Sequence, residues 1–372
     1  MMRSKSANAR ERMRAIINNE RKHEKNARTC LQRSDKICMI ILLLEYGMEE
    51  NQVHYRMEKY SGNPVLKADM CPYPAELTFN AGVIRKDDTW FMIFRNDRDW
   101  VANCDFRHMD LGMAYSKDGL RFTVYNRPVF KVSELGDPEI TRLYDVRLSE
   151  IGGRYFATMA VETKHGLRAG IGETEDFIHL KMLSMSLPDN RNLVLFPERI
   201  QGRYVRLERP FTLYNNQNYD IWISYSPDLI HWGESRLLLR HEDVRLGNAK
   251  IGPGTPPVRT PYGWLSLIHA VDYNESRGKN GYEPAWKKRY YAYALLRDLQ
   301  DPSRLLGVSD EPVIVPDSSY ELSGGFRNNV VFPTGLIKIN EKTVRAYYGA
   351  ADTVMAVAEG SVEALVRACL HT

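Results

Sequence analysis

The sequence predicts an all-β fold, a five-bladed β-propeller. A β-rich run, a tight turn and a second β-rich run recur five times in the 372-residue chain, and no long helical period interrupts residues 60–352. The copies are Ala81–Asp97, Leu143–Glu162, Leu195–Pro210, Pro257–Asp272 and Val331–Asp352. A strand-rich repeat of about 50 to 60 residues is typical of a propeller with one sheet per repeat. Because every blade turns its inner strand to one central funnel, polar residues at equivalent repeat positions are expected to converge.

Each copy contains a turn of the kind that joins the two strands of a β-hairpin. In chain order the turns are Asp87-Asp88, Gly152-Gly153, Gln201-Gly202, Pro261-Tyr262-Gly263 and Asn340-Glu341-Lys342. The related phrases at residues 115–119, 173–177 and 225–232 are expected to be turns that connect blades. The polar residues 274–286 indicate a loop that overhangs the funnel. Residues 360–370 carry apolar side chains at helical spacing, which predicts a short C-terminal helix.

The first part of the chain differs from the repeats. Residues 1–50 hold 11 Lys and Arg against 7 Asp and Glu, so they account for the whole net charge of +4. We interpret residues 1–52 as a basic extension, helical or disordered, ahead of a propeller domain at 53–372. One alternative is a basic arm that binds RNA or a membrane. A helix exposed to solvent explains the same composition. The apolar run at residues 37–46 is too short to span a bilayer.

Composition and cysteine usage narrow the class of protein. The balanced charge of the propeller argues against nucleic-acid binding, and no membrane partner is expected. The five cysteines show no CxxC pair and no metal-ligand spacing, so neither a metal site nor a disulfide framework is expected. Reduced thiols of this kind suggest a cytoplasmic protein.

Polar residues recur where the strands of the repeats begin or end. Three carboxylates belong to this set, and four cations come from the predicted third and fourth blades. The carboxylates are Asp97, Asp145 and Asp352, and the cations are Arg191, Arg209, Lys250 and His269. Arg and Lys together suit a small dianion, because the Arg fork matches phosphate oxygens and Lys adds a point charge. Carboxylates with Arg and Asn suit sugar hydroxyls, and Asn80 and Arg95 join the set as candidate sugar contacts.

Each of these residues also has a plain structural interpretation. Asp145 could be a turn residue paired with Arg147, and Arg209 could pair with the adjacent Glu208. His269 could be a satisfied core histidine. The segment GPGTPP at residues 252–257 resembles a phosphate cradle, but its three prolines lack N–H donors and favour a rigid turn. The equivalent placement in several repeats favours the functional interpretation.

Several short strings in the right order resemble glycoside hydrolase family 130, the family of β-mannoside phosphorylases and related β-mannosidases. The strings are FNAGV (79–83), FRND (94–97), YDVRL (144–148), RNLVLFPE (191–198), GRYVRLERP (202–210), KIGPGTPP (250–257), GWLSLIHAV (263–271) and YYGAADT (347–353). The resemblance covers residues 60–372 and leaves out the first fifty. It implies a five-bladed propeller and an inverting reaction in which phosphate cleaves a β-mannoside to give α-mannose 1-phosphate.

The resemblance also implies roles for individual residues. Asp145 matches the family's general acid, which is thought to pass its proton through the 3-hydroxyl of the mannose. The sugar-binding pattern falls on Asn80, Asp97, Arg107 and Asp352. The phosphate-binding pattern falls on Arg191, Arg209, Lys250 and His269. All four cations are present, which favours phosphorolysis over hydrolysis, because water needs no dianion site.

The sequence thus predicts a cytoplasmic β-mannoside phosphorylase that acts on a manno-oligosaccharide and inorganic phosphate without a cofactor. An inverting β-mannosidase and a non-catalytic carbohydrate-binding propeller are the alternatives. The strings do not distinguish a β-1,4 from a β-1,2 linkage, and a homo-oligomer is possible.

Overall fold

The computed structural model describes residues 54–102, 105–212, 219–278 and 286–370, which form one compact unit. The N-terminal extension predicted at residues 1–52 lies outside the described residues. The same holds for residues 279–285 of the loop expected at 274–286, and for Cys30, Cys38 and Cys104.

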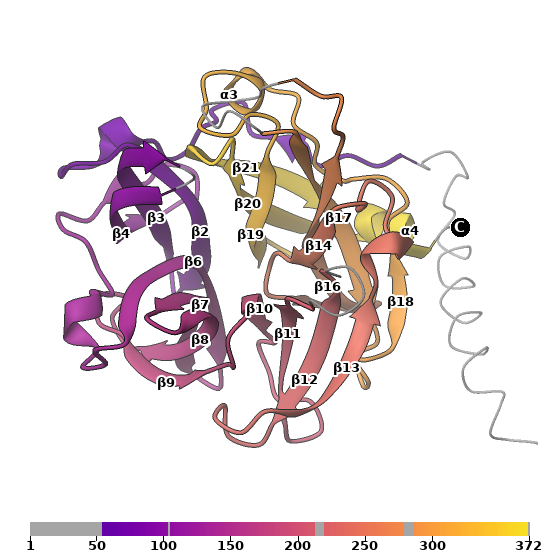
Figure 1. Ribbon diagram of the computed structural model, residues 1–372. Coiled ribbons are helices and arrows are strands. Elements are labelled where there is room, and N and C mark those ends of the chain that lie inside the picture. The colour runs from indigo at the N-terminus through magenta and orange to yellow at the C-terminus, as the bar shows by residue number, and fades with distance from the viewer. Residues whose placement is uncertain (1–53, 103–104, 213–218, 279–285, 371–372) are drawn as a thin grey trace, which may run out of the picture. The chain divides into compact units, whose positions relative to one another are not determined.

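The described residues form the predicted five-bladed β-propeller (Figure 1). Blade one contains β2 (Leu77–Lys86), β3 (Thr89–Ala102), β4 (Asp105–Ser116) and β5 (Thr123–Val124). Blade two contains β6 (Ile140–Ile151), β7 (Arg154–Thr163), β8 (Gly166–Thr174) and β9 (Lys181–Met185). Blade three contains β10 (Asn190–Leu195), β11 (Tyr204–Pro210), β12 (Ile221–Ser226) and β13 (Gly233–Leu239). Blade four contains β14 (Lys250–Pro253), β15 (Val258–Thr260), β16 (Gly263–Tyr273), β17 (Lys288–Arg297) and β18 (Leu305–Val308). Blade five contains β19 (Val331–Lys338), β20 (Thr343–Ala350), β21 (Val354–Ser361) and β1 (Glu58–Lys59).

Blade five is completed by a strand from the other end of the propeller sequence. Strand β1 pairs antiparallel with β21, with Glu58 opposite Glu359 and Lys59 opposite Ala358. The sequence does not predict this closure, because a strand of two residues has no recognisable periodicity. The predicted C-terminal helix is present as α4 (Val362–Leu370), which follows β21 and buries Leu365 and Val366.

The hairpin turns lie where the sequence predicts them, but the Ser/Asp phrases do not connect blades. Residues 115–119 join β4 to β5, and the equivalents at 173–177 and 225–232 join the third strand of their blade to the fourth. In the first of them, the Ser116 hydroxyl accepts the N–H of Gly119 at 2.9 Å and Asp118 Oδ1 accepts the N–H of Leu120 at 2.9 Å. Such bonds identify a tight turn. They do not tell which two strands it joins, which is why the prediction was wrong.

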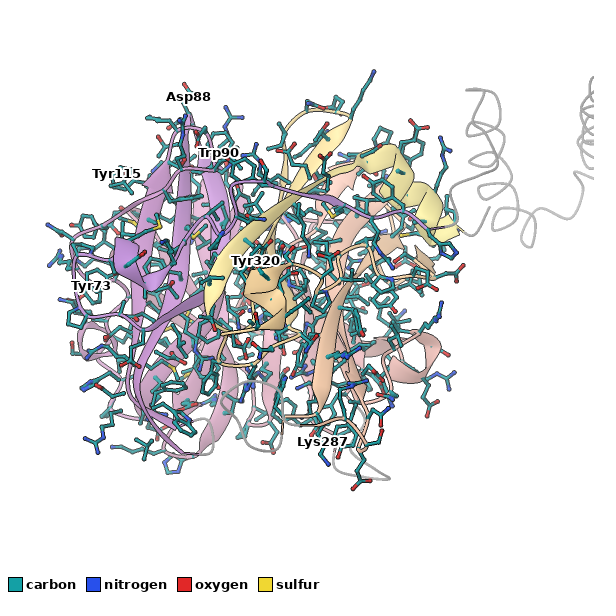
Figure 2. All side chains as sticks on the ribbon, turned by 90° about the horizontal axis from the view of Figure 1, so that it is seen from above. Tyr73, Asp88, Trp90, Tyr115, Lys287 and Tyr320 are labelled. Carbon is teal, nitrogen blue, oxygen red and sulfur yellow. The ribbon has the colours of Figure 1, made fainter. Side chains whose placement is uncertain are left out.

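Apolar side chains fill the space between neighbouring blades. One cluster joins blades one and two through Ile93, Leu143 and Met159, and another joins blades three and four through Leu207 and Trp264. Figure 2 shows the interior packed with side chains, while Asp88 lies at the outer tip of the β2–β3 hairpin. Among the described residues, no helix has the length and apolar character needed to cross a membrane.

Candidate active site

The inner strands of blades one, two and three share a β-bulge at the same place. The register shifts between Phe79 and Gly82, between Tyr144 and Arg147, and between Arg191 and Val194. Each bulge holds one residue in the left-handed backbone region: Asn80 (φ 48°), Asp145 (φ 54°) and Asn192 (φ 58°). Asn and Asp adopt this conformation more readily than other non-glycine residues. A bulge redirects a side chain, and here all three side chains line one cavity.

This cavity measures about 630 Å³, including the part open to solvent. Every residue predicted for the site lines it except Arg107. The lining residues that the sequence predicts are Asn80, Arg95, Asp97, Asp145, Arg191, Arg209, Lys250, His269 and Asp352. They come from all five blades, so the repeat positions converge as expected.

Arg107 does not belong to this cavity. It is exposed on β4, while its neighbour Phe106 is buried and lines the cavity. Successive residues on a strand point to opposite faces of the sheet, so Phe106 and Arg107 cannot both face the funnel. The cationic side chain near Asp352 is instead Arg327, whose Nη1 lies 3.1 Å from Asp352 Oδ2. Arg327 lies in the loop before β19, outside the repeated hairpins of the sequence.

Asp145 is buried and receives polar contacts from three sides. Its Oδ1 accepts a hydrogen bond from Asn80 Nδ2 at 3.0 Å and lies 3.5 Å from Arg95 Nη1. Its Oδ2 accepts a hydrogen bond from Arg191 Nη2 at 3.1 Å. Burial alone would raise the pKa of Asp145, but Arg95, Arg191 and Arg147 together lower it. The carboxylate is thus held in its charged form when the cavity contains no anion.

Arg147 does not form the simple ion pair with the Asp145 carboxylate that was one interpretation of the sequence. Its Nη1 donates to the backbone carbonyl of Asp145 at 2.5 Å, and its Nε donates to the carbonyl of Gly254 at 3.0 Å. Arg147 therefore fixes the backbone of the bulge, while Asn80, Arg95 and Arg191 contact the carboxylate oxygens.

The pKa values of Asp97 and Asp352 shift in the direction opposite to that of Asp145. Burial raises the pKa of Asp97 although Arg95 Nε donates to its Oδ2 at 2.7 Å. Burial likewise raises the pKa of Asp352, against the effect of Arg327. Asp97 Oδ1 is buried without a hydrogen-bond partner among the described residues. Buried polar atoms are normally satisfied, so this oxygen is available to a ligand hydroxyl.

The predicted cations gather on another wall of the cavity. Arg209 Nη1 lies 3.2 Å from His269 Nε2, and both side chains are buried. Burial and Arg191 lower the pKa of Arg209 to about 9. Burial and Arg209 lower the pKa of Lys250 and of His269 well below their usual values. Along the described parts of the chain, no carboxylate forms a salt bridge with Arg209, Lys250 or His269. Negative charge beside them would favour the charged forms of Lys250 and His269, so this wall suits an anion.

Two structural interpretations of these cations are not observed. Glu208 pairs with Arg206, Nη2 to Oε2 at 2.8 Å, and not with Arg209. His269 is not a satisfied core histidine, because its Nδ1 is buried without a hydrogen-bond partner in the described structure. Gly252 leaves room for the cationic wall: an added Cβ would lie 2.5 Å from His269 Cε1 and 3.0 Å from Arg209 Nη1.

Comparison with known proteins identifies the family. A family model of glycoside hydrolase family 130, described as β-1,4-mannooligosaccharide phosphorylase, matches residues 47–371. The chain belongs to this family.

Its relatives in family 130 differ in the linkage for which they are named. The β-1,2-mannobiose phosphorylase of Listeria innocua is 33% identical over 245 residues, which cover 66% of this chain and 64% of the relative. The β-1,4-mannooligosaccharide phosphorylase of Ruminococcus albus is 30% identical and covers 86% of this chain and 88% of the relative. The solved structure of the Listeria innocua β-1,2-mannobiose phosphorylase in complex with β-1,2-mannobiose superposes with a TM-score of 0.71. That match has 25% identity and covers 85% of this chain and 99% of that one.

Proposed function

We propose that this protein is an inverting β-mannoside phosphorylase, which transfers a terminal β-linked mannose from a manno-oligosaccharide to inorganic phosphate. The observation that carries the proposal is the wall formed by Arg209, Lys250 and His269, with which no described carboxylate forms a salt bridge. A phosphate dianion supplies the missing negative charge next to the buried carboxyl group of Asp145. The reaction uses phosphate as a co-substrate and no cofactor.

In this proposal, one side of the cavity binds phosphate and the other binds the sugar. Arg191, Arg209, Lys250 and His269 bind phosphate through charge-assisted hydrogen bonds, which are stronger than neutral ones. Asn80, Arg95, Asp97 and Asp352 bind the hydroxyls of the mannose. Among the carboxylates, the unpaired Oδ1 of Asp97 is an acceptor for one of these hydroxyls.

The proposed reaction breaks the bond between the anomeric carbon and the glycosidic oxygen and forms a bond between that carbon and a phosphate oxygen. Asp145 supplies the proton that the departing oxygen needs, passed through the mannose 3-hydroxyl. Phosphate attacks from the face opposite the leaving group, so the configuration inverts and the product is α-mannose 1-phosphate. The other product is the shortened sugar.

Arg191 links the two sites, because it contacts Asp145 at 3.1 Å and lines the same cavity as the other three cations. A bound phosphate partly neutralises the positive charge of Arg191 and adds negative charge near Asp145. Both effects favour the protonated carboxyl group that a general acid requires.

Incubation with β-1,2- and β-1,4-mannobiose, each with and without phosphate, tests the proposal. We expect mannose 1-phosphate from at least one of the two substrates, and only when phosphate is present. Free mannose released at the same rate without phosphate would identify a β-mannosidase instead. Binding of mannobiose with no turnover under either condition would identify a carbohydrate-binding propeller. Glucose, mannose and N-acetylglucosamine offered as acceptors in the reverse reaction then define the acceptor.

A further inference from the structure

A short loop brings Phe326 and Arg327 to the cavity. It runs from helix α3 (Ser319–Leu322) to β19. The N–H of Phe326 donates to Thr353 Oγ1 at 2.8 Å, and the N–H of Arg327 donates to the carbonyl of Ala351 at 3.0 Å. These partners flank Asp352, whose carboxylate contacts Arg327. The position of the loop and the position of the Asp352 turn are therefore coupled.

The loop is anchored on Glu321, a carboxylate with no solvent exposure. The backbone carbonyl of Glu321 accepts the N–H of Asn329 at 2.6 Å, which ties the end of the loop to the helix. Its Oε2 accepts the N–H of Ser318 at 2.8 Å, and its Oε1 accepts the hydroxyl of Tyr348 at 2.9 Å. A fully buried carboxylate needs a positive partner to offset its desolvation.

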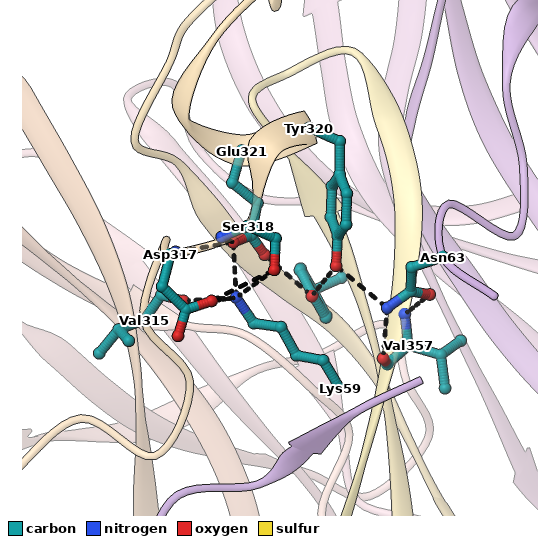
Figure 3. Close-up of polar contacts among 9 residues, drawn as sticks. Lys59, Asn63, Val315, Asp317, Ser318, Tyr320, Glu321 and Val357 are labelled. Atoms are coloured by element: carbon teal, nitrogen blue, oxygen red, sulfur yellow. Dashed lines mark hydrogen bonds and ion pairs between the residues drawn. The ribbon is translucent and has the colours of Figure 1, made fainter. Parts of the chain in front are cut away.

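That partner is Lys59 of the ring-closing strand β1. Its Nζ lies 2.5 Å from Glu321 Oε2 and donates to the carbonyl of Val315 at 2.8 Å (Figure 3). The two residues are 262 positions apart in the sequence. Asn63 adds a second contact from the same segment, donating to the Tyr320 hydroxyl at 3.1 Å. The N-terminal end of the propeller thus holds the helix from which the cavity loop begins.

We propose that Lys59 is a positioning residue of the sugar site. Through Glu321 it holds the Phe326–Arg327 loop against Asp352, and so raises the affinity for the mannoside without touching it. In the described structure, the Lys59 side chain bonds to residues 315–321 and to none of the proposed phosphate ligands. This inference rests on the function proposed above.

The kinetic test uses Lys59→Met, which removes the charge and keeps most of the volume. Lys67→Met is the matched control, because Lys67 pairs with Asp69 at 2.7 Å in the same segment and both side chains are exposed. We expect the KM for mannobiose to rise roughly 2- to 30-fold in Lys59→Met, the range that residues without ligand contact typically produce. The KM for phosphate, the kcat and all constants of Lys67→Met are expected to stay unchanged. Lys59→Arg is expected to keep most of the affinity.

A loss of thermal stability in Lys59→Met with every kinetic constant unchanged would show a merely structural role and overturn the inference. An equal rise of the two KM values would overturn it as well. Should Lys59→Met fail to fold, Tyr348→Phe carries the test, because it removes only the hydroxyl that bonds to Glu321 Oε1. It is expected to change the same constant in the same direction by a smaller factor, and an unchanged mannobiose KM would overturn the inference.

A binding measurement separates this inference from the proposed reaction. Mannobiose is titrated calorimetrically into Asp145→Asn and into the Asp145→Asn, Lys59→Met double variant, with no turnover to interfere. Weaker binding to the double variant supports the inference even if the parent protein turns out to hydrolyse mannobiose. Equal binding overturns the inference while leaving phosphorolysis untouched. Absence of mannobiose binding to the parent protein would overturn both proposals.

Discussion

Arg191 Nη2 lies 3.1 Å from Asp145 Oδ2, so one guanidinium faces both the proposed acid and the proposed phosphate site. The contact stabilises the charged form of Asp145, together with Arg95 and Arg147. A general acid must carry its proton when the glycosidic bond breaks. In the proposed reaction, a phosphate dianion beside Arg191 would favour the protonated form that Asp145 needs.

This relationship predicts how the pH profile depends on phosphate. Because the pKa of Asp145 is lowered in the phosphate-free enzyme, kcat/KM for mannobiose should fall as the pH rises above that pKa. A bound dianion raises the pKa of Asp145, so the basic limb should move to higher pH at saturating phosphate. The measurement is kcat/KM for mannobiose against pH at limiting and at saturating phosphate. A basic limb at the same pH in both series would contradict the coupling.

Replacing the acid should remove turnover without disturbing the fold. Asp145→Asn is expected to lower kcat by roughly 10²- to 10⁴-fold, the usual contribution of general acid catalysis. The amide cannot supply the proton, yet Asn tolerates the φ of 54° at this position. Initial rates and the thermal midpoint are measured together. Near-normal phosphorolysis by Asp145→Asn would show that another group is the acid.

The cationic wall should bind phosphate and not sugar. Arg209→Ala, Lys250→Ala and His269→Ala each remove one charge-assisted contact, worth about 1.5–3 kcal/mol. The apparent affinity for phosphate should fall by roughly one to two decades per substitution, while that for mannobiose changes much less. Phosphate is titrated at saturating mannobiose, and mannobiose at saturating phosphate. A Lys250→Ala protein that needs more mannobiose but no more phosphate would exclude the wall as the phosphate site.

The same wall should be a source of instability when phosphate is absent. Arg209→Met removes a buried charge with which no carboxylate in the described structure pairs. The thermal midpoint of this variant in the absence of phosphate should therefore be higher than that of the parent protein. Arg206→Met is the matched control on the same strand, because Arg206 pairs with the buried Glu208 at 2.8 Å. Its loss leaves an unpaired carboxylate and should lower the midpoint. Unfolding of both variants is followed with and without phosphate, and the stabilisation by phosphate should be smaller in Arg209→Met. Equal destabilisation of the two variants would contradict this account.

Truncations should separate the N-terminal extension from the propeller. Removal of residues 1–47 should leave activity largely unchanged, because none of the proposed site residues lies there. Removal of residues 1–60 also deletes β1 and Lys59, and should lower both the thermal midpoint and the affinity for mannobiose. Activity and oligomeric state are measured for both proteins. Loss of activity in a folded, correctly assembled protein lacking only residues 1–47 would show that the extension helps to build the site.

The propeller and most of the residues of its cavity could be predicted from short stretches of sequence. Turns such as Gly152-Gly153 carry their own signal, and five hairpins at regular spacing indicate five blades. Asp145 and Arg209 could be placed in one cavity because equivalent strand positions in a propeller face the same funnel.

What escaped prediction depends on contacts between distant segments. Strand β1 is defined only by its partner β21, and Arg327 reaches the cavity on a loop without a repeat pattern. Arg107 was assigned from family resemblance, whereas the alternation of side chains along β4 exposes it. The sequence also does not predict the β-bulges at Asn80 and Asp145, because polar residues occur at the ends of strands for several different reasons.

The left-handed backbone at Asp145 restricts how this protein can diverge. Glu carries the same acid but is poorly suited to that conformation, and its longer side chain would displace the carboxyl group. Asn suits the conformation, and a single base change converts an Asp codon into an Asn codon. A lineage can therefore lose the proposed acid in one step while the blades and the proposed sugar and phosphate contacts stay in place. In this scaffold, a protein that binds sugar without turnover is one substitution away from the proposed phosphorylase.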